Sequence, residues 1–152
     1  MRSAILRADG SDQLGMGHIM RCLAFASELR RRGIENTFVI RNFHDKVAKV
    51  IRDAQFKVVE IAVDLPVSKA SAFTREVASK VGSRVIIADL CTRPGMEDRD
   101  ELDEHHRGLG TGFFLVTLSG GQIVDLPGNI LVSPYVITRN IDGSPTGQAG
   151  QA

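Results

Sequence analysis

The sequence has few cysteines, no excess of one charge and no long apolar run, and each absence narrows the class of protein. The spacing of its two cysteines, Cys22 and Cys91, fits neither a metal nor a redox motif, so we expect reduced thiols in a cytoplasmic protein. Nineteen basic and eighteen acidic side chains leave a net charge of +1, which argues against general electrostatic binding of nucleic acid. No segment approaches the ~20 apolar residues of a membrane span, and the apolar run at the N-terminus is too short for a signal peptide.

Two sequence segments look like functional motifs but lack residues or spacing that the function needs. The segment "LSGGQ" at 118–122 spells the signature of ABC transporter ATPases, but the chain lacks the phosphate loop GxxxxGK[ST] that this assignment needs. We interpret it as a turn after a strand, in which Ser119 and the glycines could still line a crevice. In "DRDELDEHHRG", His105 and His106 are adjacent and point about 100° apart on a helix. We therefore interpret this segment as a solvated helix face, and we expect neither a metal nor another cofactor.

Short β-rich runs alternate with helical patterns along the chain, which predicts an α/β fold with right-handed crossovers and a mostly parallel sheet. We expect one domain over residues 1–140, and a disordered tail at 141–152 because that stretch is small and polar. The expected strands are Ser3–Ala8, Asn36–Arg41, Lys57–Ile61, Arg84–Asp89, Gly112–Leu118 and Asn129–Val132. The expected helices are Gly17–Arg32, His44–Gln55, Ser68–Val81 and Asp98–Leu109.

The first helix has the clearest pattern. Apolar residues recur at helical spacing and make one face, and Gly33 then ends the helix as a C-cap glycine. The basic run at residues 30–32 is interpreted as the solvated end of this helix, where cations complement the dipole. The residues of the apolar face are Ile19, Cys22, Leu23, Ala26 and Leu29.

A polar loop, "DGSDQLGMG", separates the first strand from the first helix. Ligands of open parallel sheets bind beyond the C-terminal ends of the strands, and Asp9, Gly10 and Ser11 lie directly after such an end. Asp89 ends the apolar strand "VIIAD", which we expect to lie next to the first strand. The sequence therefore predicts a ligand crevice between these two strand ends.

His18 lies at the start of the first helix and faces this predicted crevice. The free N–H groups there favour bound anions and disfavour an imidazolium, so the histidine can accept a proton. Arg21 lies on the same side one turn later, and Gly15 and Gly17 would allow positive φ and a close approach to a ligand. We predict a general base beside a phosphorylated or polyhydroxylated ligand; the alternative is a histidine that merely caps the helix. The loop is not a dinucleotide fingerprint, because Met20 occupies the position of the third glycine.

The segment "RADGSDQLGMGHIMRCLAFASELRRRG" resembles the opening of the UDP-sugar hydrolase of pseudaminic acid biosynthesis. Spore-coat polysaccharide proteins and, more distantly, glycosyltransferases of the two-domain GT-B fold are related to that family. The resemblance continues more weakly to about Tyr135, so that it covers about residues 2–138. The positions that match the family pattern are Arg7, Asp9, Ser11, Gly15, Gly17 and His18.

The resemblance implies a Rossmann-like three-layer domain, similar to the N-terminal half of a GT-B fold. It implies that His18 activates a water molecule, which attacks the anomeric carbon of a UDP-sugar and expels UDP. It further implies that Asp9 and Ser11 shape the sugar pocket and that Asp89 orients His18 or binds the sugar. The expected substrate-binding residues are Asp9, Gly10, Ser11, Gly15, Gly17, Arg21 and Asp89.

The sequence departs from the family at three places. Leu90 and Cys91 stand where the family tends to have His and Tyr, and Gly120 and Gly121 stand where it tends to have two acids. The chain also stops where the family has its second domain, which holds the uridine and most of the diphosphate. Four hypotheses stay open. The first three are a hydrolase half that works with a separate C-terminal polypeptide or as a homodimer, a non-catalytic sugar-nucleotide or carbohydrate-binding domain, and half of a glycosyltransferase. The fourth is a truncated gene product that dimerises through an exposed apolar patch near Val132–Val136.

Overall fold

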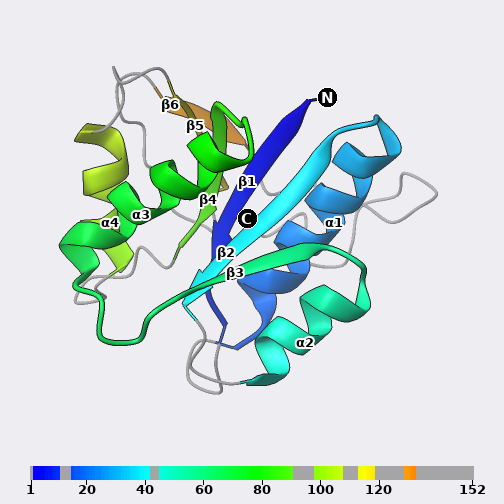
Figure 1. Ribbon diagram of the computed structural model, residues 1–152, viewed down its shortest axis with the longest axis horizontal. Helices are drawn as coiled ribbons and strands as arrows, with labels where there is room; N and C mark the ends of the chain where they lie inside the picture. Colours follow the sequence, from blue (N-terminus) through cyan, green and yellow to red (C-terminus); the bar gives the residue numbers. More distant parts are fainter. Residues whose placement is uncertain are drawn as a thin grey trace, which may run out of the picture.

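Among the described residues, the sheet consists of six parallel strands in the spatial order β3-β2-β1-β4-β5-β6 (Figure 1). The computed structural model describes residues 2–10, 15–41, 45–90, 98–107, 113–118 and 129–132. The strands are β1 (Ser3–Ala8), β2 (Glu35–Arg41), β3 (Lys57–Ile61), β4 (Val85–Asp89), β5 (Phe114–Leu118) and β6 (Asn129–Val132).

Helices cover both faces of this sheet, which gives the three layers expected from the sequence. Neighbouring residues of one strand, such as Ile5 and Leu6 of β1, point to opposite faces and belong to two separate apolar cores. Helices α1 and α2 pack in the core that contains Leu6, and α3 and α4 pack in the core that contains Ile5. The helices are α1 (Gly17–Arg31), α2 (Asp45–Asp53), α3 (Val67–Lys80) and α4 (Asp98–Arg107).

The order of the strands creates a switch point between β1 and β4. The chain runs outward from β1 through β2 to β3, and α3 then carries it back to β4 on the other side of β1. The two strands pair in register, with Ala8 opposite Asp89, so the predicted adjacency of these two strands is confirmed. The helices that follow β1 and β4, α1 and α4, lie on opposite faces of the sheet, and such a switch point is where open α/β sheets bind ligands.

The predicted elements agree with the structure to within about two residues where both can be compared. Helix α1 buries Ile19, Cys22, Leu23 and Ala26 as predicted. It ends at Arg31 with Arg32 as its C-cap, and Gly33 follows with a φ of 81°, in the left-handed region that favours glycine. The predicted tail at 141–152, the "SGGQ" of "LSGGQ" and Cys91 lie outside the described residues.

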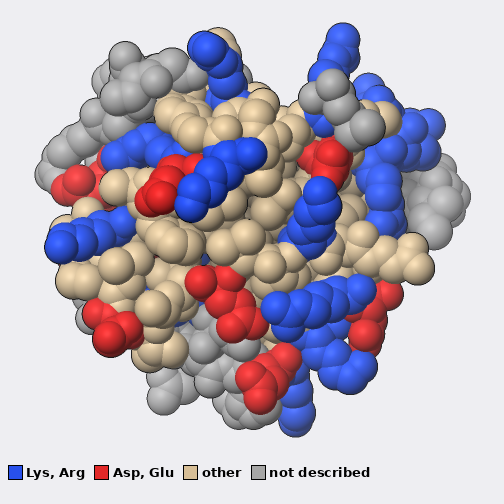
Figure 2. Space-filling view, viewed as in Figure 1, with Lys and Arg blue, Asp and Glu red and all other residues tan. Residues whose placement is uncertain are grey.

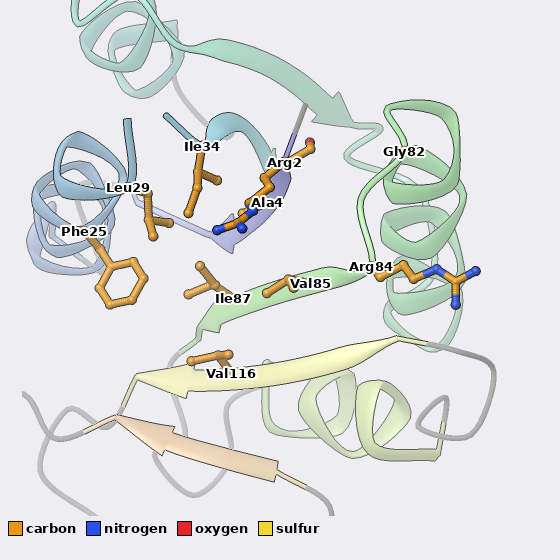
Figure 3. Close-up of a pocket in the computed structure, with 11 residues that line it drawn as sticks. Arg2, Ala4, Phe25, Leu29, Ile34, Gly82, Arg84, Val85, Ile87 and Val116 are labelled. Atoms are coloured by element: carbon orange, nitrogen blue, oxygen red, sulfur yellow. The ribbon is translucent and has the colours of Figure 1, made fainter. Parts of the chain in front are cut away.

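An apolar groove of about 440 Å³ lies on the α1 side of β4 and β5 (Figure 3). Phe25 and Leu29 of α1 form one wall, and Ile87 of β4 and Val116 of β5 form the floor. Helix α1 contacts β1 and β2, and α2 contacts β3, whereas α3 and α4 lie on the opposite face.

Charged side chains of both signs are scattered over the face that Figure 2 shows. The basic run at residues 30–32 does end α1, and Arg31 and Arg32 both pair with Glu28 on the same helix. Arg30 instead lies over the ring of Phe56, with its guanidinium carbon 4.1 Å from the ring centroid. None of the helices in the described parts of the chain is long and apolar enough to cross a membrane.

Candidate functional site

The switch point holds a hydrogen-bonded cluster of His18, Arg21 and Asp89. Nδ1 of His18 lies 2.7 Å from Oδ1 of Asp89. Arg21 donates from Nε to Oδ2 of Asp89 at 2.6 Å and from Nη2 to Oδ1 at 2.5 Å. Asp89 is fully buried at the end of β4, whereas the side chain of His18 is 20% exposed. The structure thus brings together three of the residues that the sequence predicts for the site.

The carboxylate of Asp89 determines which nitrogen of His18 can act as a base. A carboxylate accepts hydrogen bonds, so Nδ1 of the neutral imidazole carries the hydrogen and Nε2 keeps the free electron pair. His18 is the second residue of α1, whose N-cap is Met16, and no side chain caps this helix end. The alternative in which His18 serves only as a cap is therefore not what the structure shows.

Arg21 compensates the buried charge of Asp89. Burial alone would lower the pKa of Arg21, but its hydrogen bonds to Asp89 and the charge of that carboxylate outweigh burial and raise it. The bidentate pair uses both oxygens of Asp89. Asp89 is therefore held as a hydrogen-bond acceptor for His18 in a fixed orientation.

Two of the loop glycines have a clear physical reason to be glycine. Gly15 has a φ of 75°, which a residue with a side chain rarely adopts. A Cβ on Gly10 would lie 2.9 Å from Cγ1 of Ile19 and 3.2 Å from the sulfur of Met16, so this backbone packs directly on the first turn of α1. The prediction of positive φ is wrong for Gly17, which begins α1 with open space around it. Ser11 lies outside the described residues.

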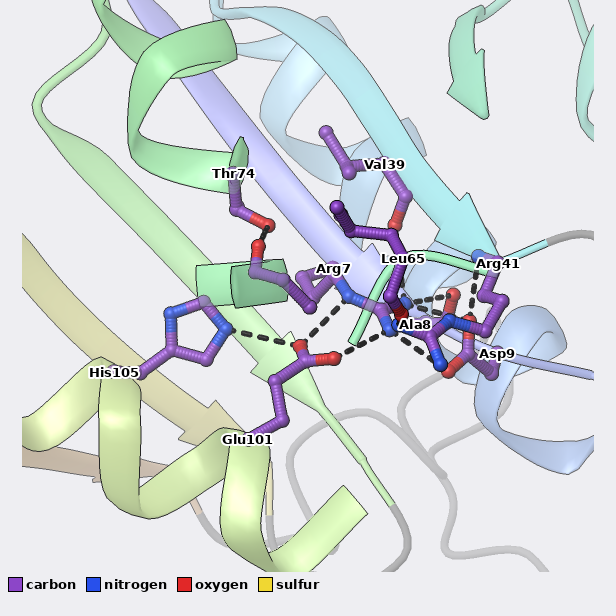
Figure 4. A network of polar contacts seen from close by, with 10 residues as sticks. Arg7, Ala8, Asp9, Val39, Arg41, Leu65, Thr74, Glu101 and His105 are labelled. Atoms are coloured by element: carbon purple, nitrogen blue, oxygen red, sulfur yellow. Dashed lines mark hydrogen bonds and ion pairs between the residues drawn. The ribbon is translucent and has the colours of Figure 1, made fainter. Parts of the chain in front are cut away.

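A second polar cluster, centred on Arg7, lies on the opposite face of the same sheet edge (Figure 4). The Arg7 guanidinium is fully buried and donates to both oxygens of Asp9, at 2.6 and 2.9 Å, and to both oxygens of Glu101, at 2.8 Å each. Asp9 also accepts from the backbone N–H of Arg41 at 2.8 Å. Both oxygens of Asp9 are thus engaged inside the protein, so a direct contact of this carboxylate with a sugar stays a prediction.

The interpretation of the segment at 98–107 as a solvated face is wrong for three of its residues. Glu101, Leu102 and His105 are buried, because one side of α4 packs over the end of β1 beside α3. His105 lies one turn after Glu101, and its Nε2 is 3.1 Å from Oε2 of that residue. Across the described residues, no group of three or more His, Cys, Asp and Glu side chains could hold a metal ion.

One sequence signal could have revealed the second cluster. Arg7 lies inside the strand "SAILRA", in a sheet whose strands are covered on both faces. A guanidinium at an inward position of such a strand needs a buried carboxylate. Asp9 and the acids of the helix that follows β4 are the candidates that the topology offers.

Acid should weaken the folded state through Glu101. Burial alone would raise the pKa of Glu101, but the charge of Arg7 and hydrogen bonds from His105 and Arg7 lower it from the usual 4.5 to about 2. A carboxyl whose pKa is lower in the folded state contributes stability above about pH 4.5, and this contribution is lost as the pH falls toward about 2. We expect the free energy of unfolding of wild type and Glu101→Gln to differ at pH 6 and to converge between pH 4.5 and 2. Urea titrations at each pH test this; a difference that is independent of pH would contradict it.

Comparisons with known proteins place this fold in a known class. No protein-family model matches the chain. Solved structures with a similar fold include MurG of Acinetobacter baumannii, with a TM-score of 0.59 and 11% identity over 83% of this chain and 37% of that one. A glycosyltransferase from Rickettsia africae has a TM-score of 0.56 and 12% identity over 89% of this chain and 38% of that one. The glycotransferase of kitacinnamycin has a TM-score of 0.55 and 14% identity over 78% and 30% of the two chains.

The fold is therefore the Rossmann-like α/β fold of the N-terminal half of GT-B glycosyltransferases. An uncharacterized protein of Methanocaldococcus jannaschii, MJ1062, is 37% identical over 60 residues, which are 40% of this chain and 12% of that protein. The chain thus spans well under half of the length of each of these proteins.

Proposed function

We propose that this chain is the base-bearing half of an enzyme that acts on nucleotide sugars, and that its reaction is hydrolysis of a UDP-sugar. The observation that carries the proposal is the hydrogen bond from Nδ1 of His18 to the buried Asp89, which leaves Nε2 of a partly exposed imidazole free to accept a proton. The fold class and the resemblance of residues 7–33 to UDP-sugar hydrolases support the choice of substrate.

Water, the UDP-sugar and the three residues of this cluster account for every bond that forms or breaks in the reaction. The oxygen of a water molecule bonds to the anomeric carbon while one proton of that water passes to Nε2 of His18. The bond between the anomeric carbon and the phosphate oxygen breaks, and its electron pair leaves with UDP. Asp89 stabilises the imidazolium that forms, and Arg21 keeps Asp89 in place. The backbone at Gly10, Gly15 and Gly17 is the proposed neighbour of the sugar.

The nucleotide must be anchored for this chemistry to be efficient, because binding of the remote part of a substrate positions its reacting end. The chain spans 37% of MurG and 38% of the Rickettsia glycosyltransferase. We therefore propose that efficient turnover needs a further nucleotide-binding unit, whether it belongs to the same polypeptide or to another.

A glycosyltransferase half is the second candidate, because the solved structures with this fold that we compare are themselves glycosyltransferases or MurG. In that case His18 would take the proton of an acceptor hydroxyl in place of water. The two candidates differ in one observable property: a hydrolase releases UDP without an acceptor, whereas a transferase requires one.

The test is UDP release from a panel of UDP-sugars, with and without added sugar acceptors. We expect at most slow release by the wild type without an acceptor, and a decrease of about 10²–10⁴-fold in His18→Ala, because general-base catalysis contributes about this factor. Met20→Ala is the matched control, since Met20 lies two residues later on α1 and is 53% exposed. Release only with an acceptor would favour the transferase. Binding of UDP-sugars without any release would favour the non-catalytic domain.

A further inference from the structure

Glu101 lies on α4, on the face of the sheet opposite to His18. Its carboxylate accepts hydrogen bonds from Arg7, which lies near the end of β1. We propose that Glu101 is a positioning residue for His18, acting through Arg7, Asp9 and Gly10. This inference rests on the proposed function only in assigning His18 as the base; the physical connection stands on the contacts below.

The connection begins at Arg7, whose guanidinium binds two carboxylates. Its Nε and Nη2 donate to Glu101, and its Nη1 and Nη2 donate to Asp9. One planar guanidinium therefore holds both carboxylates in fixed orientations, and neither can move without breaking two short hydrogen bonds. His105 holds Glu101 from the other side at 3.1 Å. The place of Asp9 thus depends on the place of Glu101.

The second step runs from Asp9 to the first turn of α1. Gly10 follows Asp9 directly, and its backbone packs so closely on Ile19 and Met16 that a single added carbon would meet Ile19 at 2.9 Å. Ile19 is the neighbour of His18 in sequence and is fully buried. A shift of Asp9 would therefore move Gly10 against the turn that carries His18, because packed interiors transmit strain.

The third step reaches the partner of His18. Nη1 of Arg7 also donates to the carbonyl oxygen of Ala8 at 3.1 Å. Ala8 lies opposite Asp89 in the register of β1 and β4. The same guanidinium is thus connected to both members of the hydrogen bond between His18 and Asp89, although it touches neither of them.

The test measures the imidazole of His18 directly. In the wild type labelled with ¹⁵N at histidine, the two ring nitrogens should show the tautomer with hydrogen on Nδ1; the His18 signal among the four histidines is the one that His18→Ala removes. We expect Glu101→Gln to shift this signal toward a mixture of tautomers. If UDP is released, kcat should fall about 10–100-fold with little change in KM, because a misplacement of about 1 Å costs up to this factor.

A control variant and a second substitution at position 101 separate this proposal from a general loss of stability. Glu76→Gln makes the same change on the exposed side of α3, where Glu76 pairs with Lys80, and should leave the His18 signal unchanged. If Glu101→Gln fails to fold, Glu101→Met replaces it in the test. Methionine fills the same space without polar groups, and Arg7 still has Asp9 as its counter-ion. Unchanged His18 signals in a folded Glu101 variant would overturn the inference. Loss of the Nδ1 tautomer in a chain that releases no UDP would support it while rejecting the proposed function.

Discussion

Asp89→Asn is expected to lower UDP release by about as much as His18→Ala does, about 10²–10⁴-fold, because an amide in place of the carboxylate can leave the imidazole in the wrong tautomer. Asp89 accepts three hydrogen bonds, one from His18 and two from Arg21. Asparagine has one acceptor oxygen and one donating NH₂ group, so a donor must face either Arg21 or the imidazole. If it faces the imidazole, Nδ1 becomes the acceptor and Nε2 carries the hydrogen, which removes the base.

The control for this variant is Asp53→Asn, which changes an exposed carboxylate that pairs with Lys49 on α2. Both variants should be compared at equal folded concentration, since Arg21 loses its counter-ion in Asp89→Asn. Release by Asp89→Asn within tenfold of the wild type would show that the carboxylate does not orient the base, and His18 would then need another partner.

The cluster of His18, Arg21 and Asp89 could be predicted because each member follows from local rules. The alternation of strands and helices predicts a parallel sheet, and an aspartate at the end of an apolar strand lies at its ligand-binding edge. A helix that starts after a glycine-rich loop places residues 18 and 21 on one side. None of these steps requires knowledge of how distant side chains pack.

The cluster around Arg7 could not be predicted in the same way. The segment "DRDELDEHHR" is so rich in charge that a solvated face is the default expectation for each of its residues. Glu101 and His105 are buried because Arg7, 94 residues before Glu101 in sequence, offers a charge that compensates the cost of desolvation. The side of α4 that faces inward is thus determined by a residue on another element, which a periodic pattern in α4 alone does not contain.

The two clusters at this sheet edge differ in exposure to solvent. On the α1 side, His18 is partly exposed and can reach a ligand. On the opposite side, Arg7, Asp9 and Glu101 are buried, and their polar atoms bind one another. The partly exposed cluster is therefore suited to chemistry, and the buried cluster is suited to holding the strand ends in place. This division predicts that changes to Arg7 act on stability more than changes to His18 do.

Arg7→Met is expected to lower the free energy of unfolding by about 3–5 kcal/mol, the usual loss when one partner of a buried ion pair is removed. The substitution leaves two carboxylates, Asp9 and Glu101, buried without a guanidinium. A loss of this size is a large part of the ~5–15 kcal/mol that stabilise a typical domain. Urea denaturation followed by circular dichroism measures it directly.

Two companion variants separate charge burial from the loss of a long side chain. Arg31→Met removes an exposed guanidinium that pairs with Glu28 on the surface of α1, and its unfolding midpoint should stay close to that of the wild type. Adding Glu101→Leu to Arg7→Met removes one of the two stranded charges, so it should recover part of the lost stability, as replacement of buried ion pairs by apolar residues often does. A stability of Arg7→Met within about 1 kcal/mol of the wild type would mean that Asp9 and Glu101 find other partners or water. In that case the buried cluster could not be what fixes the ends of β1 and β4.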